Sequence, residues 1–399
     1  MKIEKLNHQG HGIGYVDNKI TFVAKAIPGD HVEIKITKTD KKTNEAKIIS
    51  FNHESDKRVV PKCPVFEKCG GCDLLNMSYE DTLLFKRNKV KEIFLKYANL
   101  EINPEMIASS NINNYRNKIT IKINNGKIGY YEESTHYIVE TDNCLIAQES
   151  INNFIKDIPS LKIKNGEITI RANYNDELLI NIDSKDKIKI KFQELKTNHK
   201  IVGFIINHQL VNGEAYFIDK INEHLFQVSY NSFFQVNRSI FSEILTYSLG
   251  LLKKSNTLLD LYCGVGTFST FLSPKFKKVY GIEIVHSAIK DALINNKINN
   301  ITNIDYLLGA VEETVSKIEA KIDTIVVDPP RAGVDKQTMV NIINLLPKEI
   351  LYVSCNAITL ARDIRALSDK YQMEGIKLFD MFPYTAHVEC VVLLQRKKI

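Results

Sequence analysis

The chain has 399 residues, 44% of them hydrophobic and 25% charged, which is typical of a globular protein and excludes collagen-like and wholly disordered chains. Lys and Arg outnumber Asp and Glu by 53 to 47, and the resulting net charge of +6 permits a polyanionic partner without requiring one. Neither a signal-peptide core nor an apolar run of the ~18 residues that a membrane helix needs occurs, so we expect a cytoplasmic protein without membrane attachment.

Short strands separated by turn residues dominate the first part of the chain, residues 1–58. Gly12, Gly14 and the Pro28-Gly29-Asp30 sequence mark the turns, so the pattern predicts a small β-barrel. The segment GHGIGYVDNKITFVAKAIPGDHVEIKITK resembles a TRAM domain, an OB-like barrel found on RNA-modifying enzymes. The resemblance implies an RNA-binding surface on a strand face and its loops.

Three cysteines then follow within ten residues, in the spacing C-x5-C-x2-C. Seven cysteines in a chain without a secretory signal favour reduced thiols, a metal site or catalysis over a disulfide framework. Cys63, Cys69 and Cys72 therefore predict a metal centre, and Cys144 is the best candidate for a fourth ligand because it lies outside the C-terminal α/β region. Four thiolates suit zinc or an iron-sulfur cluster, and the spacing alone does not separate the two.

A helix is predicted to begin at Ser78, with Asp81 at the capping-box position. One face is apolar, and the other is basic and expected to be solvated, with an RNA-facing helix as the alternative. The apolar face comprises Leu83, Leu84, Val90, Phe94 and Tyr97, and the basic face Lys86, Arg87, Lys89, Lys91 and Lys96.

From about residue 110 to residue 226 the pattern changes to alternating strands. Asn-Gly pairs at Asn125-Gly126, Asn165-Gly166 and Asn212-Gly213 indicate tight turns, so we expect an antiparallel α+β central domain.

Beyond residue 230, apolar strands alternate with helical segments, which predicts a doubly wound, Rossmann-like α/β domain with its ligand at the carboxyl ends of the strands. In DLYCGVGTFS, Gly264 and Gly266 permit close backbone approach by a ligand, whereas Ser269 stands where a dinucleotide fingerprint has Gly or Ala. Glu283 ends the next strand and can accept two ribose hydroxyls. These features favour S-adenosylmethionine over a nicotinamide cofactor.

Three further strand ends carry reactive groups: Asp328, Cys355 and Glu389. Cys355 stands at a helix N-terminus, whose dipole is expected to lower its thiol pKa. Carbon 5 of uracil becomes nucleophilic once a thiolate adds to C6, and a base must later remove the C5 proton. Cys355 suits the first task and Glu389 the second. Phe233 and Phe234 are candidates for stacking on a base extracted from folded RNA, although one of them is expected to serve core packing.

Together these residues resemble the RNA uracil-5-methyltransferase family, in particular its 23S ribosomal RNA branch with a TRAM domain and a [4Fe-4S] cluster. Further matching motifs are YRNK at Tyr115–Lys118, SFFQVN, DPPRAG, VSCN and HVE. The resemblance implies cluster ligation by the four cysteines named above and cofactor contacts from Gln235, Tyr262, Gly264, Glu283 and Asp328. It also implies a discontinuous catalytic domain.

The predicted domains are a TRAM barrel (1–58), a central domain with the cysteines (59–75 and 107–229) and a methyltransferase domain (76–106 and 230–399). The expected activity is methylation of C5 of a uridine in 23S ribosomal RNA. The T-loop uridine of transfer RNA is the alternative substrate, and a non-catalytic RNA-binding factor and a DNA cytosine methyltransferase are weaker alternatives. We expect a monomer.

Overall fold

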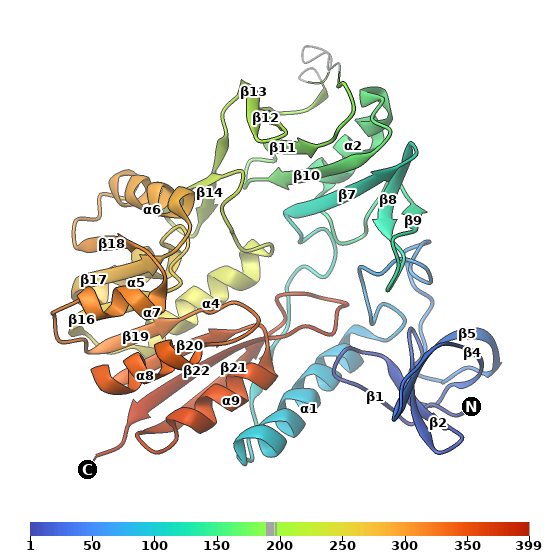
Figure 1. Ribbon diagram of the computed structural model, residues 1–399, viewed down its shortest axis with the longest axis horizontal. Coiled ribbons are helices and arrows are strands. Elements are labelled where there is room, and N and C mark those ends of the chain that lie inside the picture. The colour runs from blue at the N-terminus through green and yellow to red at the C-terminus, as the bar shows by residue number, and fades with distance from the viewer. Residues whose placement is uncertain (189–194, 196–197, 399) are drawn as a thin grey trace.

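The computed structural model describes residues 1–188, 195 and 198–398. A five-stranded sheet forms the N-terminal part, in the order β1-β2-β3-β5-β4 (Figure 1). The Lys2–His31 bridge joins the start of the chain to β4, and Ile3, Val23 and Val32 fill the interior. The OB-like closure of this sheet stays a prediction. Its strands are β1 (Lys5–Leu6), β2 (Gly12–Val16), β3 (Lys19–Val23), β4 (His31–Thr39) and β5 (Thr43–His53).

Helix α1 (Tyr79–Ala98) begins where the capping pattern predicts, because the Ser78 side chain accepts a hydrogen bond from the Asp81 backbone N–H. The predicted division of its faces is partly wrong. Leu84 is 51% exposed, whereas Lys86 and Lys89 are buried. These two lysines are inside because α1 lies between the N-terminal sheet and the C-terminal part of the chain, where acceptors meet them (Figure 1).

A seven-stranded sheet forms the centre of the chain, in the order β13-β12-β11-β10-β7-β8-β9. It is antiparallel as expected except for β11 and β12, which are parallel. Asn125-Gly126 joins β7 to β8, but Asn212-Gly213 lies within β13, and Asn207-His208 forms the turn before it. The elements are β7 (Lys118–Asn124), β8 (Lys127–Tyr131), β9 (Ile138–Glu140), α2 (Glu149–Asp157), β10 (Gly166–Ala172), β11 (Leu178–Asp183), β12 (Ile201–Ile206) and β13 (Gln209–Gly213). A separate hairpin follows, β14 (Tyr216–Ile221) and β15 (His224–Ser229).

The C-terminal part is the predicted α/β fold, an eight-stranded sheet in the order β18-β17-β16-β19-β20-β22-β21-β6. The first five strands of that order are parallel, and β22 is inserted antiparallel between β20 and β21. The strands are β6 (Glu105–Ile107), β16 (Ser255–Leu261), β17 (Phe276–Glu283), β18 (Ile304–Leu308), β19 (Thr324–Val327), β20 (Glu349–Ser354), β21 (Tyr371–Phe379) and β22 (Glu389–Arg396).

Helices cover this sheet on both faces and build its two largest core clusters (Figure 1). They are α4 (Arg238–Leu251), α5 (Thr267–Leu272), α6 (His286–Ile298), α7 (Val311–Thr314), α8 (Lys336–Leu345) and α9 (Ala357–Leu367). Two elements that precede the central sheet in the chain also belong here: α1 packs against α9, and β6 pairs with β21. The domain limits themselves stay a prediction. In the described part of the chain, no helix is long and apolar enough to cross a membrane.

Candidate functional site

The glycine turn after β16 is built for close approach of a ligand. Gly264 and Gly266 both have positive φ angles, and a Cβ added at Gly264 would meet no atom within 4 Å, so its backbone faces open space. The Gly264 N–H donates to Glu283 Oε2 at 3.1 Å, which fixes the carboxylate at the end of β17 beside the turn.

Two further contacts hold the elements on either side of this turn. The buried Asp260 carboxylate accepts hydrogen bonds from the Ser269 N–H and hydroxyl, which fixes the start of α5. The hydroxyl of Tyr262, the first residue after β16, donates a hydrogen bond to Asp335 Oδ2 at 3.5 Å.

The segment 231–237 connects the hairpin β14–β15 to α4 and is anchored to the central sheet. Asn117 donates from its side chain to the Gln235 carbonyl at 3.0 Å, and Arg171 donates to the Ser232 carbonyl at 2.6 Å. One of the two aromatic rings of this segment belongs to the core, as expected: Phe234 is buried, whereas Phe233 is 67% exposed.

Cys355 and Glu389 meet at one edge of the C-terminal sheet. Ser354 of β20 pairs with Cys390 of β22, so the next residues outward in this antiparallel register are Cys355 and Glu389. Asp328 follows β19, the other neighbour of β20, and therefore reaches the same edge. The sequence thus places these three groups correctly relative to the strands, and the sheet order brings them together.

The expected lowering of the Cys355 pKa is wrong. Burial and the nearby Glu389 raise the pKa of this thiol to about 11, against the attraction of Arg331. The helix dipole at α9 is a local effect, whereas the burial of the thiol depends on tertiary packing and Glu389 stands 34 residues later in the chain. Burial and Asp328 likewise raise the pKa of Glu389 well above its usual value.

Two polar residues beside Cys355 were missed as site residues, although both belong to motifs that the sequence shows. Arg331 donates to His387 Nε2 at 3.2 Å, and both side chains line a cavity of about 180 Å³ together with Cys355. Burial, Arg331 and Lys89 lower the pKa of His387 to about 4, so the ring is neutral at pH 7. The sequence could have indicated both residues, because Arg331 directly follows Asp328-Pro329-Pro330 and His387 stands two residues before Glu389.

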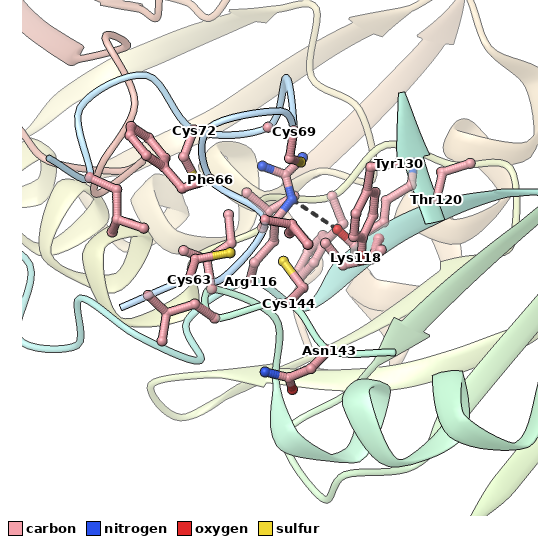
Figure 2. Close-up of a pocket in the computed structure, with 18 of the residues that line it drawn as sticks. Cys63, Phe66, Cys69, Cys72, Arg116, Lys118, Thr120, Tyr130, Asn143 and Cys144 are labelled. Carbon is pink, nitrogen blue, oxygen red and sulfur yellow. Dashed lines mark hydrogen bonds between the residues drawn. The ribbon is translucent and has the colours of Figure 1, made fainter. Parts of the chain in front are cut away.

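The four cysteines predicted as ligands line one cavity of about 470 Å³ (Figure 2). Cys63, Cys69 and Cys72 lie on the loop before α1, and Cys144 faces them from the segment after β9 (Figure 2). Burial is the largest cause that raises the pKa of Cys69, Cys72 and Cys144. No group of three or more His, Cys, Asp or Glu side chains in a metal-binding arrangement occurs in residues 1–188, 195 and 198–398. The sulfur atoms therefore share a cavity without forming a closed metal site.

Comparison with known proteins identifies two sequence families in the chain. Residues 78–397 match the model of the tRNA (uracil-5-)-methyltransferase family, and residues 1–49 match the model of the TRAM domain. An RNA methyltransferase of Clostridium acetobutylicum, itself uncharacterized, is 35% identical over 99% of this chain and 96% of its own length. A relative from Listeria innocua with the same description is 34% identical over 100% of this chain and 97% of its own length.

The fold is similar to that of a solved structure over nearly the whole chain. That structure is the Pyrococcus abyssi tRNA (uracil-54, C5)-methyltransferase in complex with S-adenosyl-L-homocysteine. The alignment has a TM-score of 0.80 and 26% sequence identity, and it covers 99% of both chains. The N-terminal sheet and the cysteine segment of the present chain are therefore included in this match.

Proposed function

Because the chain belongs to the tRNA (uracil-5-)-methyltransferase family and is thus an RNA methyltransferase, we propose that it methylates C5 of a uridine in a structured RNA, with Cys355 as nucleophile and Glu389 as base. The observation that carries this proposal is the strand register. It sets a cysteine and a glutamate opposite each other where β20 ends and β22 begins, at the carboxyl ends of the parallel strands where a ligand is expected.

Cys355 begins the reaction by adding its sulfur to C6 of the uracil, which makes C5 an enolate carbon. The thiol must first lose its proton to solvent, and with a pKa of about 11 it holds that proton at neutral pH in the free protein. Arg331 is the cation that opposes this effect, and the Asn356 side chain donates to the Arg331 carbonyl at 2.9 Å, which fixes its backbone next to the nucleophile.

S-adenosylmethionine, when bound, supplies the methyl group that the C5 carbon takes up. The open space at Gly264 and the fixed Glu283 carboxylate suit a nucleoside without a phosphate. The residues proposed to hold S-adenosylmethionine are Gly264, Glu283, Asp328, Tyr262 and Gln235. The S-adenosyl-L-homocysteine in the archaeal structure supports this choice.

Glu389 completes the reaction by removing the C5 proton, after which the C6–S bond breaks and Cys355 leaves as a thiolate. A buried carboxyl with a raised pKa is a suitable acceptor for that proton once it is ionised. The exposed Phe233 ring is proposed to stack on the target base or its neighbour, because the ring already faces solvent without a core to fill.

Cys63, Cys69, Cys72 and Cys144 are proposed to hold a [4Fe-4S] cluster. The donor set fits, because four cysteines from two chain segments surround a single cavity. The cluster would serve a structural purpose by tying the Cys144 segment to the loop before α1. Anaerobic purification with iron, sulfide and zinc analysis tests the assignment, and zinc alone would refute it.

The proposed substrate is 23S ribosomal RNA, on the resemblance of the TRAM and cysteine combination to that branch. Transfer RNA is the second candidate, because the structure of the Pyrococcus abyssi tRNA enzyme aligns with this chain over 99% of both chains.

The direct test incubates the protein and labelled S-adenosylmethionine with unmodified 23S ribosomal RNA or transfer RNA, followed by nucleoside mass analysis. We expect 5-methyluridine in one RNA and none with Cys355→Ala. Product in transfer RNA alone would select the second substrate. Methyl transfer by Cys355→Ala would refute the proposed nucleophile, and no product in either RNA would favour a binding factor.

A further inference from the structure

The loop that precedes Glu389 contacts the cysteine segment in addition to its own sheet and α1. We call Asp380–Val388, between β21 and β22, the base loop, and Cys63–Leu74 the cysteine loop. On the β20 side the described strand pairing stops at Ser354–Cys390, one residue short of Glu389. Among the described strand pairs, Glu389 takes part only in the one with Phe379 on the β21 side. The contacts of the base loop therefore contribute to where the Glu389 carboxyl lies relative to Cys355.

Hydrogen bonds join the two loops directly. The Asp73 and Leu74 N–H groups both donate to the Tyr384 carbonyl at 3.0 Å. In the opposite direction, the Ala386 N–H donates to Asp73 Oδ2 at 2.8 Å. Ala386 is three residues before Glu389, and Asp73 is adjacent to Cys72.

Side-chain packing follows the same path. Tyr384 of the base loop is buried in a small apolar cluster with Phe66 and Tyr115, and Cys63, Cys72 and Cys144 pack against that cluster. Tyr384 also has a φ angle of +63°, a left-handed conformation that a non-glycine residue keeps only when its surroundings hold it. The Tyr115 hydroxyl donates to the Pro383 carbonyl at 3.1 Å.

We propose that Asp73 is a positioning residue for removal of the C5 proton, because it holds the base loop, and with it Glu389, against the cysteine loop. This inference rests on the proposed function and adds a task for the cysteine loop within it. If Glu389 is displaced, methyl transfer still occurs, but the C5 proton stays on the carbon. The bond between Cys355 Sγ and C6 then cannot break, and the methylated RNA remains attached to the protein.

The test compares Asp73→Ala with Asp73→Asn, which keeps an oxygen able to accept from the Ala386 N–H. Both variants are mixed with S-adenosylmethionine and the RNA that the wild type methylates. We then measure the released 5-methyluridine, the protein–RNA adduct that resists denaturant, the iron content of the protein and the midpoint of its thermal unfolding. Glu389→Gln serves as the reference for adduct accumulation.

We expect Asp73→Ala to lose turnover by about 10- to 100-fold, as misplaced catalytic groups do, and to accumulate adduct like Glu389→Gln. Its iron content should equal that of the wild type, and Asp73→Asn should turn over nearly normally. Normal turnover by Asp73→Ala, or slow turnover without adduct, would overturn the inference.

If Asp73→Ala fails to fold, Tyr384→Ala tests the same docking of the base loop on the cysteine loop through its side-chain packing. It removes the ring that packs with Phe66 and keeps the carbonyl that accepts from Asp73 and Leu74, and Tyr384→Phe is its matched control. Adduct with the first and not with the second supports the inference, and equal behaviour of the two refutes it. A wild type that makes no 5-methyluridine, or a Glu389→Gln variant that forms no adduct, refutes the proposed function instead.

Discussion

Replacing Lys86 by methionine tests how α1 is attached to the base loop. Lys86 is completely buried, and its ammonium lies 2.5 Å from Asp380 Oδ1 and donates to the Phe382 carbonyl at 2.9 Å. Tyr79 donates to the other carboxylate oxygen at 2.7 Å. Methionine has a similar length but no charge, so Lys86→Met leaves a buried carboxylate with the tyrosine hydroxyl and no cation. Removal of one partner from a buried ion pair costs about 3–5 kcal/mol, and we expect a loss of that size in the free energy of unfolding.

Urea unfolding followed by circular dichroism measures this loss. Lys91→Met on the same helix is the matched control, because Lys91 is only partly buried and its replacement should change stability by no more than about 0.5 kcal/mol. The double variant Lys86→Met/Asp380→Asn should recover part of the loss, since it removes the unpaired charge as well. A loss below about 1 kcal/mol for Lys86→Met would refute the inference that this pair is closed to water.

Further variants test the site itself. Phe233→Ala should leave stability within about 0.5 kcal/mol of the wild type and weaken RNA binding by about 1–3 kcal/mol in a filter-binding assay, because the ring is exposed and proposed to stack. Phe234→Ala should instead cost about 3–5 kcal/mol of stability in urea unfolding, since that ring is buried; equal effects of the two variants would contradict the assigned division. Arg331→Gln removes the cation that lowers the Cys355 pKa, so alkylation of that thiol by iodoacetamide should need a higher pH, and an unchanged alkylation profile would refute this role.

Local sequence patterns predict the features that depend on neighbouring residues. The Ser78 cap, the glycine turn at Gly264 and the positions of Cys355 and Glu389 at strand ends all follow from spacing within a short segment. Patterns of this kind fix which strand end a residue occupies, and the parallel sheet then determines which ends meet.

Effects that depend on distant partners were not predictable in this way. Lys86 belongs to a basic helix face in the sequence, but its partner Asp380 lies 294 residues later, so its burial could not be read from the helix. The raised pKa of Cys355 was missed for the same reason, because the helix dipole is visible in the local sequence whereas the burial of the thiol and the position of Glu389 are not. The parallel pairing of β11 and β12 likewise joins strands that are separated in the chain, and no local turn signal determines its direction.

The cavity beside Cys355 shows why these distant contacts matter for the proposed reaction. The cavity is lined by Cys355 together with residues from three other parts of the chain: His8 and Gln9 of the N-terminal part, Lys89 of α1 and His387 of the base loop. Lys89 also donates to the Ala386 and His8 carbonyls, so one buried ammonium connects the base loop to the N-terminal sheet. The N-terminal sheet therefore forms part of the wall around the nucleophile. Deleting it would open that cavity and remove an acceptor of Lys89, so its contribution extends beyond the RNA binding that the TRAM resemblance implies.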